Sequence, residues 1–117
     1  MTGSNLIYHM CRAEEWQQAQ TTGFYTGSSQ DKADGFIHFS SAAQVVDSAA
    51  RHRAGQTGLL LLAVEVDQVA GHLKWELSGR GQMFPHLYGD LPVASVKWAK
   101  PLPLGPDGLH LFPSLKT

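Results

Sequence analysis

The amino-acid sequence predicts an α+β fold in which curved, mostly antiparallel sheets carry two main helices. Three observations lead to this prediction. Two segments in the first half of the chain have the apolar spacing or the end signals of helices. Short apolar runs typical of strands cluster in the second half. Strands and helices do not alternate along the chain, as they would in a parallel βαβ fold.

The first helix is expected from Glu14 to just before Gly23, behind a strand over residues 6–10. Acidic residues at its beginning suit the helix dipole, and glycine is common where a helix ends. The polar segment at residues 26–35 is rich in Gly, Ser and Asp, and we predict a loop there. A short strand is expected next, over residues 36–39.

The second helix has the strongest pattern in the chain. Ser41 precedes Gln44 by three residues, which is the spacing of a capping box. Apolar residues then follow at the positions that form one buried helix face: Ala42, Val45, Val46 and Ala49. Basic residues in the last turn, with Gly55 just beyond, indicate where the helix ends.

The second half of the chain is expected to supply most of the strands. The continuous apolar run over residues 58–66 predicts a central strand that is buried on both faces. Further strands are expected at residues 72–77, 83–88 and 94–99. The GPDG turn then predicts a terminal hairpin that returns over residues 109–112.

Composition and charge limit the classes of function. The chain has 117 residues, of which 43% are hydrophobic, and this predicts one globular domain over residues 1–117. The formal net charge of −1 does not support nucleic-acid binding. No apolar run approaches the ~20 residues of a membrane span, so no membrane association is expected. With a single cysteine and no leader-like segment, we expect a cytoplasmic protein. The patterns do not point to an oligomeric state.

Three of the 6 histidines stand in apolar, strand-like segments. They are His9 in LIYHMC, His38 in GFIHFSS and His86 in FPHLYG. Imidazole can exchange a proton near neutral pH, bind a metal ion or form hydrogen bonds, so three such residues predict a shared site. Each can also be a structural histidine that bonds a buried group, and this alternative stays open. The other histidines are expected at the surface or in a turn: His52, His72 and His110.

Other kinds of site have weaker support. Three histidines can hold zinc, but the spacings HxH, HExxH and CxxC are missing from the sequence. We therefore expect no bound metal, and a histidine-based metal-dependent hydrolase stays an alternative. Cys11 lies two residues from His9, on the same side of the expected strand. It could be a nucleophile, but we expect a small buried thiol. The glycine-rich loops match neither GxGxxG nor the P-loop pattern.

Four motifs occur in a specific order along nearly the whole chain: IYHMC, WxxA, DGFIHFSS and FPHLYGDLP. In this combination the chain resembles the bacterial domain-of-unknown-function 952 family. That family in turn resembles the ADP-ribosyltransferase-like fold, a looser likeness that rests on three short motifs. By this resemblance His9 holds the key place of the first strand, and His38 stands where an aromatic residue is usual. His86 stands where the fold usually has a catalytic glutamate.

The resemblance implies an enzyme-like domain for which NAD is a possible substrate, with no tightly bound cofactor. Cleavage of the nicotinamide–ribose bond develops positive charge on the sugar, which a carboxylate stabilises. The imidazole of His86 cannot supply that negative charge. Glu76, on the preceding expected strand, is the best substitute, although a solvent-facing strand residue is an equally good interpretation. We therefore predict catalytic roles for His9, His38, His86 and Glu76.

The same resemblance implies a cleft for a small nucleotide-type ligand such as NAD, ADP-ribose or a related 2′-phosphonucleotide. Residues expected to contact it carry hydroxyl, aromatic or guanidinium groups: Tyr8, Phe39, Ser40, Ser41, Tyr88, Arg12 and Arg80. The implied chemistry is glycosyl or phosphoryl transfer, and the alternative is a non-catalytic module that only binds a nucleotide or another small ligand. By strand alternation His86 and Tyr88 should face the cleft while Leu87 turns into the core.

Overall fold

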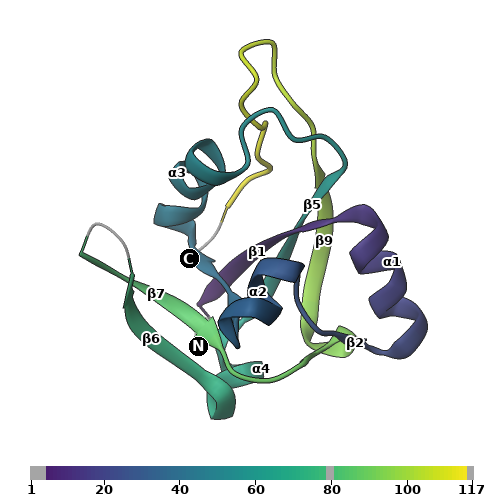
Figure 1. Cartoon of the computed structure of the whole chain (residues 1–117), viewed down its shortest axis with the longest axis vertical. Helices are drawn as coiled ribbons and strands as arrows, with labels where there is room; N and C mark the ends of the chain where they lie inside the picture. Colours follow the sequence, from purple (N-terminus) through teal and green to yellow (C-terminus); the bar gives the residue numbers. More distant parts are fainter. Residues whose placement is uncertain (1–4, 79–80, 116–117) are drawn as a thin grey trace.

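Two antiparallel sheets form the frame of the structure (Figure 1). The computed structural model describes residues 5–78 and 81–115. Within these ranges the larger sheet has the strand order β4-β1-β5-β9 and the smaller sheet the order β3-β7-β6. The strands of the larger sheet are β1 (Leu6–Arg12), β4 (Ser40–Ser41), β5 (Leu59–Glu65) and β9 (Val96–Leu102). The strands of the smaller sheet are β3 (Ile37–His38), β6 (Leu73–Ser78) and β7 (Gln82–Leu87).

Helices and short connecting elements complete the described part of the chain. The helices are α1 (Ala13–Thr22), α2 (Ser29–Asp34), α3 (Ala42–His52) and α4 (Val66–Val69). Short 3₁₀ turns span Ala70–His72 and Val93–Ser95, and β2 (Phe24–Tyr25) pairs with β8 (Leu91–Pro92). The predicted α+β class with antiparallel sheets is confirmed, and the two longest helices are the two expected from the sequence. No helix among the described residues is long and apolar enough to cross a membrane.

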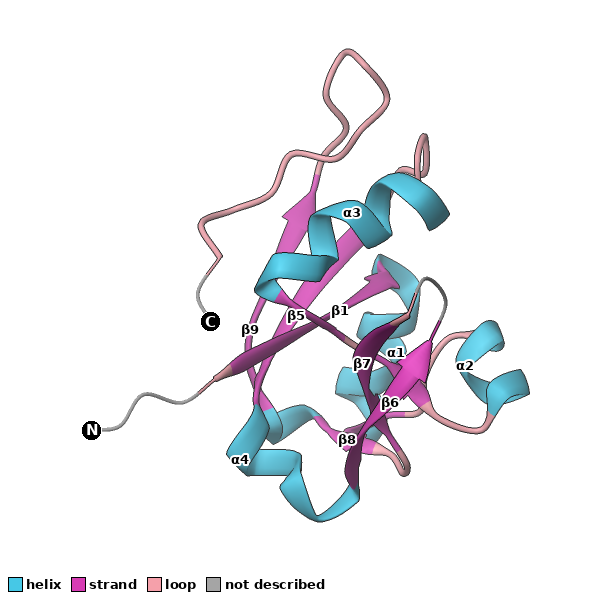
Figure 2. Ribbon diagram, turned by 90° about the vertical axis from the view of Figure 1, so that its left-hand side faces the viewer, coloured by secondary structure: helices cyan, strands magenta, loops and turns pink. Residues whose placement is uncertain are grey.

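Hydrophobic residues cover both faces of the larger sheet. Strand β5 lies between β1 and β9, which confirms the prediction of a central strand. Along β1, Ile7 and Cys11 face one buried cluster, whereas Leu6 and Tyr8 face the other. Helix α3 packs on the second face through Val45, while α1 and the smaller sheet cover the first (Figure 2). The smaller sheet is thereby held beside β1, and this arrangement creates the site described below.

Helix α2 shows that the predicted loop at residues 26–35 is wrong. The Ser28 hydroxyl accepts a hydrogen bond from the Asp31 backbone N–H at 3.2 Å. The Asp31 carboxylate in turn accepts from the Ser28 N–H at 2.8 Å. This reciprocal capping box forms a short helix that has no apolar periodicity, so the pattern that reveals most helices is missing here.

Three further expectations differ from the structure. Val46 is exposed, because the buried stripe of α3 is centred on Val45 and Ala49, about 100° away around the helix. The terminal hairpin is reduced to one antiparallel bridge, between Leu104 and His110. His110 is buried instead of lying at the surface, and its Nε2 donates to the carbonyl of Gln56 at 2.8 Å. His52 and His72 are exposed, as expected.

We predict that Gly27 is needed to seat α2. Its φ of 97° is left-handed, and a Cβ added there would lie 2.8 Å from the Cβ of Asp31. Gly35, at the other end of α2, has φ 87° but open space around it. Gly35→Ala should therefore lower the free energy of unfolding by about 1 kcal/mol, and Gly27→Ala by about 1–3 kcal/mol more. Urea denaturation of both variants measures this difference. Equal losses in the free energy of unfolding would show that the position of Asp31 does not require a glycine at residue 27.

Candidate functional site

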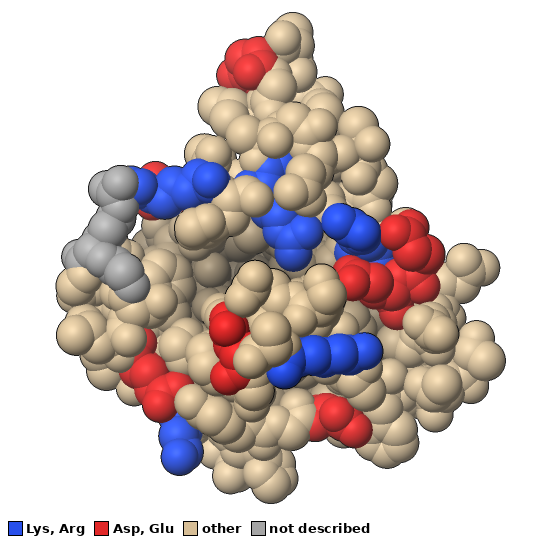
Figure 3. Space-filling view, in the orientation of Figure 1, with Lys and Arg blue, Asp and Glu red and all other residues tan. Residues whose placement is uncertain are grey.

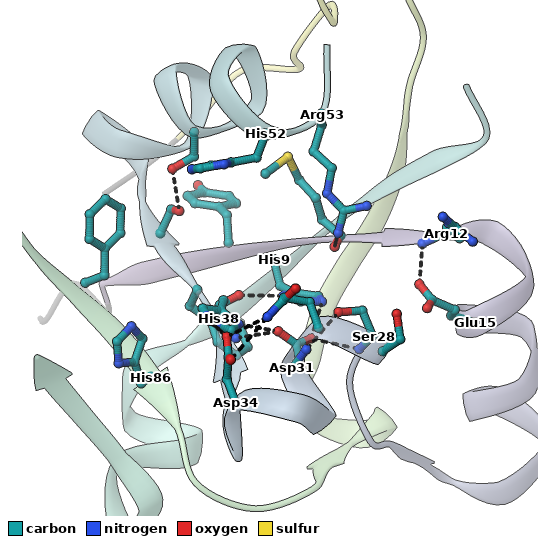
Figure 4. Close-up of a pocket in the computed structure, with 18 of the residues that line it drawn as sticks. His9, Arg12, Glu15, Ser28, Asp31, Asp34, His38, His52, Arg53 and His86 are labelled. Carbon is teal, nitrogen blue, oxygen red and sulfur yellow. Dashed lines mark hydrogen bonds and ion pairs between the residues drawn. The ribbon is translucent and has the colours of Figure 1, made fainter. Parts of the chain in front are cut away.

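The three strand histidines line one cavity of about 620 Å³. His9 comes from β1 of the larger sheet, and His38 and His86 come from β3 and β7 of the smaller one. The rings of His38 and His86 lie 5.6 Å apart between centroids, because these two residues are directly paired across β3 and β7. Figure 4 shows His86 at one end of the cavity, Arg12 and Arg53 at the other, and His9 and His38 between them.

Asp31 is the buried acid at the centre of this arrangement, with 3% of its side chain exposed. One carboxylate oxygen accepts from Nδ1 of His38 and, at 3.1 Å, from the backbone N–H of His38. The other oxygen bonds Ser28 and lies 3.6 Å from Nε2 of His9. Burial alone would raise the pKa of Asp31, but the hydrogen bonds and the nearby histidines outweigh it and lower the pKa to about 2.

His38 is a histidine with a carboxylate at each ring nitrogen. Its Nδ1 donates to Asp31, and its Nε2 lies 3.0 Å from the carboxylate of Asp34. The hydrogen bond to Asp31 is the largest cause that raises the pKa of His38, against the opposing effect of burial. The ring therefore favours the doubly protonated, positively charged form. It cannot accept a proton from a ligand while both acids hold it.

His9 has the opposite character, because it is buried and both its nitrogens are bonded inside the protein. Its Nδ1 donates to the carbonyl of His38, and its Nε2 accepts from the hydroxyl of Tyr25 at 2.7 Å. Burial is the main cause that lowers the pKa of His9, although Asp31 partly opposes it. The ring is thus neutral, with one tautomer selected by its partners. This geometry matches the structural histidine that the sequence left open as an alternative.

His86 is the histidine with an available nitrogen. Its Nδ1 donates to Oε1 of Glu76 at 2.8 Å, and the hydroxyl of Tyr88 donates to the same oxygen at 2.6 Å. The ring stacks on Phe36, with 4.1 Å between centroids. Within the described residues, Nε2 of His86 has no hydrogen-bond partner. An imidazole that is oriented by a carboxylate and has its other nitrogen unprotonated has the arrangement of a general base.

The acid behind His86 is held in its ionised form. The hydrogen bond from Tyr88, followed by that from His86, lowers the pKa of Glu76. Leu87 is buried in the core and His86 lines the cavity, as the alternation predicted, but Tyr88 does not line the cavity. Glu76 itself does not line the cavity, and it touches the site through His86. A carboxylate that contacts a ligand directly would instead come from the cavity wall.

The remaining predicted site residues divide into two groups. Those that line the cavity are Tyr8, Arg12, Phe39 and Ser40. Ser41 instead caps α3, where its backbone N–H donates to Gln44 at 3.0 Å, and Tyr88 lies behind His86. Arg80 lies outside the described residues. Cys11 is fully buried, and burial raises the pKa of its thiol to about 12, so it is a buried thiol and not a nucleophile.

Sequence reasoning missed four residues of the site. Tyr25, Asp31 and Asp34 bond the histidines, and Arg53 lines the cavity. The spacing of Ser28 and Asp31 is a capping-box signal that could have revealed α2 and its acid. The sequence indicates Arg53 only as one of the basic residues at the end of the second helix, whereas in the structure it also donates to the carbonyl of Met10 at 3.3 Å.

Charges of both signs border the hollow in the surface (Figure 3). Arg12 and Arg53 lie at one end of the cavity together with Glu15, and the acids Asp31 and Asp34 belong to the rest of its wall. Because His38 offsets Asp31 and Asp34, and two guanidinium groups outnumber the one carboxylate of Glu15, the arginine end is the part that can attract an anion. Among the residues that the structure describes, no group of three or more His, Cys, Asp or Glu side chains is placed to hold a metal ion.

Comparison with known families matches residues 10–99 to the family described as "Protein of unknown function (DUF952)". The chain belongs to the DUF952 family. This confirms the family expected from the histidine motifs, and the matched range contains two of the three histidines, His38 and His86. The finer resemblance to the ADP-ribosyltransferase-like fold remains a prediction.

The DUF952 protein is also similar to solved structures of CC0527 from Caulobacter crescentus. The crystal structure of CC0527 is 43% identical, covers 91% of this chain and 93% of that one, and has a TM-score of 0.87. The solution NMR structure of CC0527 is 44% identical, covers 89% of this chain and 90% of that one, and has a TM-score of 0.81. No curated protein matches the chain.

We predict that His38 and His9 of this DUF952 protein titrate on opposite sides of pH 6.5, the ordinary value for histidine. His38 should keep its second proton above that pH, and His9 should stay neutral below it. Imidazole nitrogen NMR through a pH titration measures both. A pKa of His38 at or below 6.5 would contradict the stabilisation of its charged form by Asp31 and Asp34. Asp31→Asn should bring the pKa of His38 down.

The pairing of His38 with Asp31 should also make the free energy of unfolding depend on pH. Because the pKa of His38 is raised, its contribution is complete below pH 6.5 and is lost as the pH rises through the folded pKa. Asp31 contributes above its ordinary pKa of 3.8, and that contribution is lost as the pH falls towards about 2. The wild type should therefore lose stability on both sides of this window, and Asp31→Asn should flatten the curve.

Proposed function

We propose that the cavity binds a nucleotide-type ligand with a phosphate and a ribose, of which NAD and ADP-ribose are representatives. The proposed reaction is glycosyl or phosphoryl transfer, with His86 as the group that accepts or donates the proton. The observation that carries the proposal is His86 itself. It lines the cavity, has no protein partner at Nε2 within the described residues, and is oriented by Glu76.

The arginine end of the cavity is the proposed phosphate subsite. Arg53 is held in place by Gln56 at 3.1 Å and by the carbonyl of Met10, so its guanidinium is positioned before any ligand arrives. Arg12 lines the same end. Guanidinium groups bind phosphate through charge-assisted, often paired hydrogen bonds. The cavity of about 620 Å³ also falls within the usual range for small-molecule sites.

The middle of the cavity is the proposed ribose subsite. Asp34 belongs to the wall and is partly exposed, with its carboxylate towards His38. It can stabilise positive charge on a sugar there, which moves to Asp34 the role that sequence reasoning gave to Glu76. Glu76 is proposed instead to orient His86. The resemblance to ADP-ribosyltransferases also supports a ribose subsite, because the three motif histidines expected to share a cleft line one cavity.

A second candidate is a module that binds the same ligand without chemistry. The observation that favours it is that His9 and His38 each have both ring nitrogens bonded to protein groups. A metal-dependent hydrolase is not proposed, because His9 and His38 could ligate a metal only after breaking those bonds. Any turnover would therefore depend on His86. If no turnover is found, the cavity is a binding site without chemistry.

We predict that ADP-ribose raises the melting temperature of the wild type and that Arg53 is required for this effect. Arg53→Met removes a charge-assisted contact of about 1.5–3 kcal/mol, so affinity should fall roughly tenfold to a hundredfold. Arg51→Met is the matched control, because Arg51 lies in the last turn of α3, two residues before Arg53, but pairs with Asp47 outside the cavity. Isothermal titration measures both variants. If neither ADP-ribose nor NAD binds the wild type, the nucleotide proposal is wrong.

If the wild type cleaves NAD, His86→Gln should reduce the rate about a hundredfold or more, the usual contribution of a positioned acid or base. Glu76→Gln should reduce it less, because it removes the carboxylate that orients the imidazole through Nδ1. The affinity for ADP-ribose should remain close to that of the wild type in both variants. Binding without turnover in the wild type would select the second candidate.

A further inference from the structure

Strand β6 forms an open edge of the smaller sheet, since β7 is its only paired strand among the described residues. Trp75 stands opposite Pro85, which has no N–H and whose carbonyl accepts from Phe39 at 3.0 Å, on the side away from β6. Trp75 therefore directs its own N–H and carbonyl to the open edge. By alternation, the backbone groups of Leu77 and the carbonyl of Leu73 point the same way.

The apolar face of this hairpin continues beyond the core. Pro85 and Leu87 are buried on that face. Further along it, Trp75 is 45% exposed, Leu77 is 70% exposed and Met83 is 48% exposed. A tryptophan and a leucine on a free strand edge, with an exposed methionine on the neighbouring strand β7, are typical of an interaction surface. We call these three residues and the outer edge of β6 the edge surface.

The charged residues on the opposite face of β6 favour a second β6 strand as the partner of this edge surface. Lys74 and Glu76 flank Trp75 on either side. If a second β6 strand pairs antiparallel about Trp75, Lys74 of one copy stands opposite Glu76 of the other, and Trp75 stands opposite Trp75. These oppositely charged positions are non-hydrogen-bonded pairs, in which the side chains approach most closely. A parallel pairing in register would instead oppose like charges.

Both charged groups keep capacity for such a partner. His86 and Tyr88 both bond Oε1 of Glu76, and Oε2 has no hydrogen bond within the described ranges. Lys74 makes no ion pair in the part of the chain that the structure describes, and its Nζ lies 5.0 Å from the ring centroid of Tyr88. Among the described residues, the strand thus presents a cation without an ion pair and a carboxylate oxygen without a hydrogen bond, and a twofold axis through Trp75 would place them opposite each other in two copies.

We propose that the edge surface binds a second copy of this chain, with two β6 strands paired antiparallel about Trp75. The two three-stranded sheets then form one continuous sheet. Trp75 exchanges two backbone hydrogen bonds with its counterpart, and Leu77 N–H donates to the Leu73 carbonyl in both directions. The N–H of Leu73 does not take part, because it bonds the carbonyl of Ala70. This homodimer does not depend on the function proposed for the cavity.

Light scattering coupled to size-exclusion chromatography over a range of concentrations tests the dimer. The wild type should be dimeric, and Leu77→Lys should be monomeric because it places a charge on the apolar face at the edge. Leu111→Lys is the matched control, since Leu111 is 56% exposed on the C-terminal segment and should leave the dimer intact. A wild type that is monomeric at the highest soluble concentration, or equal effects of the two substitutions, would overturn the proposal.

A charge reversal tests the register of the pairing. Lys74→Glu opposes like charges twice across the twofold axis and should weaken the dimer tenfold or more. The double variant K74E/E76K restores opposite charges and should recover dimerisation. Circular dichroism and thermal melting show that each variant is folded. A folded double variant that stays as weakly dimeric as K74E would refute the antiparallel pairing about Trp75.

Discussion

The site depends on one buried carboxylate. Asp31 caps its own helix through Ser28, holds the backbone and the ring of His38, and lies beside the ring of His9. It thereby links α2 to strands from both sheets. A buried carboxylate is costly unless it is bonded, and the contacts that lower the pKa of Asp31 to about 2 show that it is. The close approach of Gly27 is the steric condition for this position.

Three histidines that look alike in the sequence have three different electrostatic roles. His9 is neutral because it is buried and its nitrogens are already bonded. His38 favours its charged form, because Asp31 and Asp34 both contact its ring and raise its pKa. His86 is oriented by one acid and keeps a nitrogen for the cavity. The first two build the wall, and the third is the residue on which chemistry at this site would depend.

The same acid relates the cavity to the edge of the sheet. Glu76 bonds His86 and Tyr88 through one oxygen, and its other oxygen lies on the strand with the open edge. In the proposed dimer, Lys74 of the second copy approaches the carboxylate that orients His86. An added positive charge beside Glu76 stabilises its ionised form. Assembly would therefore reinforce the hydrogen bond between Glu76 and His86.

The sequence by itself determined the fold class, the family and the identity of the three histidines. Local sequence patterns predict these features: the apolar run of β5, the capping box of α3 and the short motifs around each histidine. Only the tertiary structure decided which histidine has a lowered pKa, which has a raised pKa, and which keeps a ring nitrogen without a hydrogen-bond partner among the described residues. The deciding partners are distant in sequence. Asp31, which bonds the ring of His38, lies 7 residues from it, and the carbonyl of His38, which bonds the ring of His9, lies 29 residues from His9. A protonation state depends on burial and on nearby charges, and neither is set by local sequence.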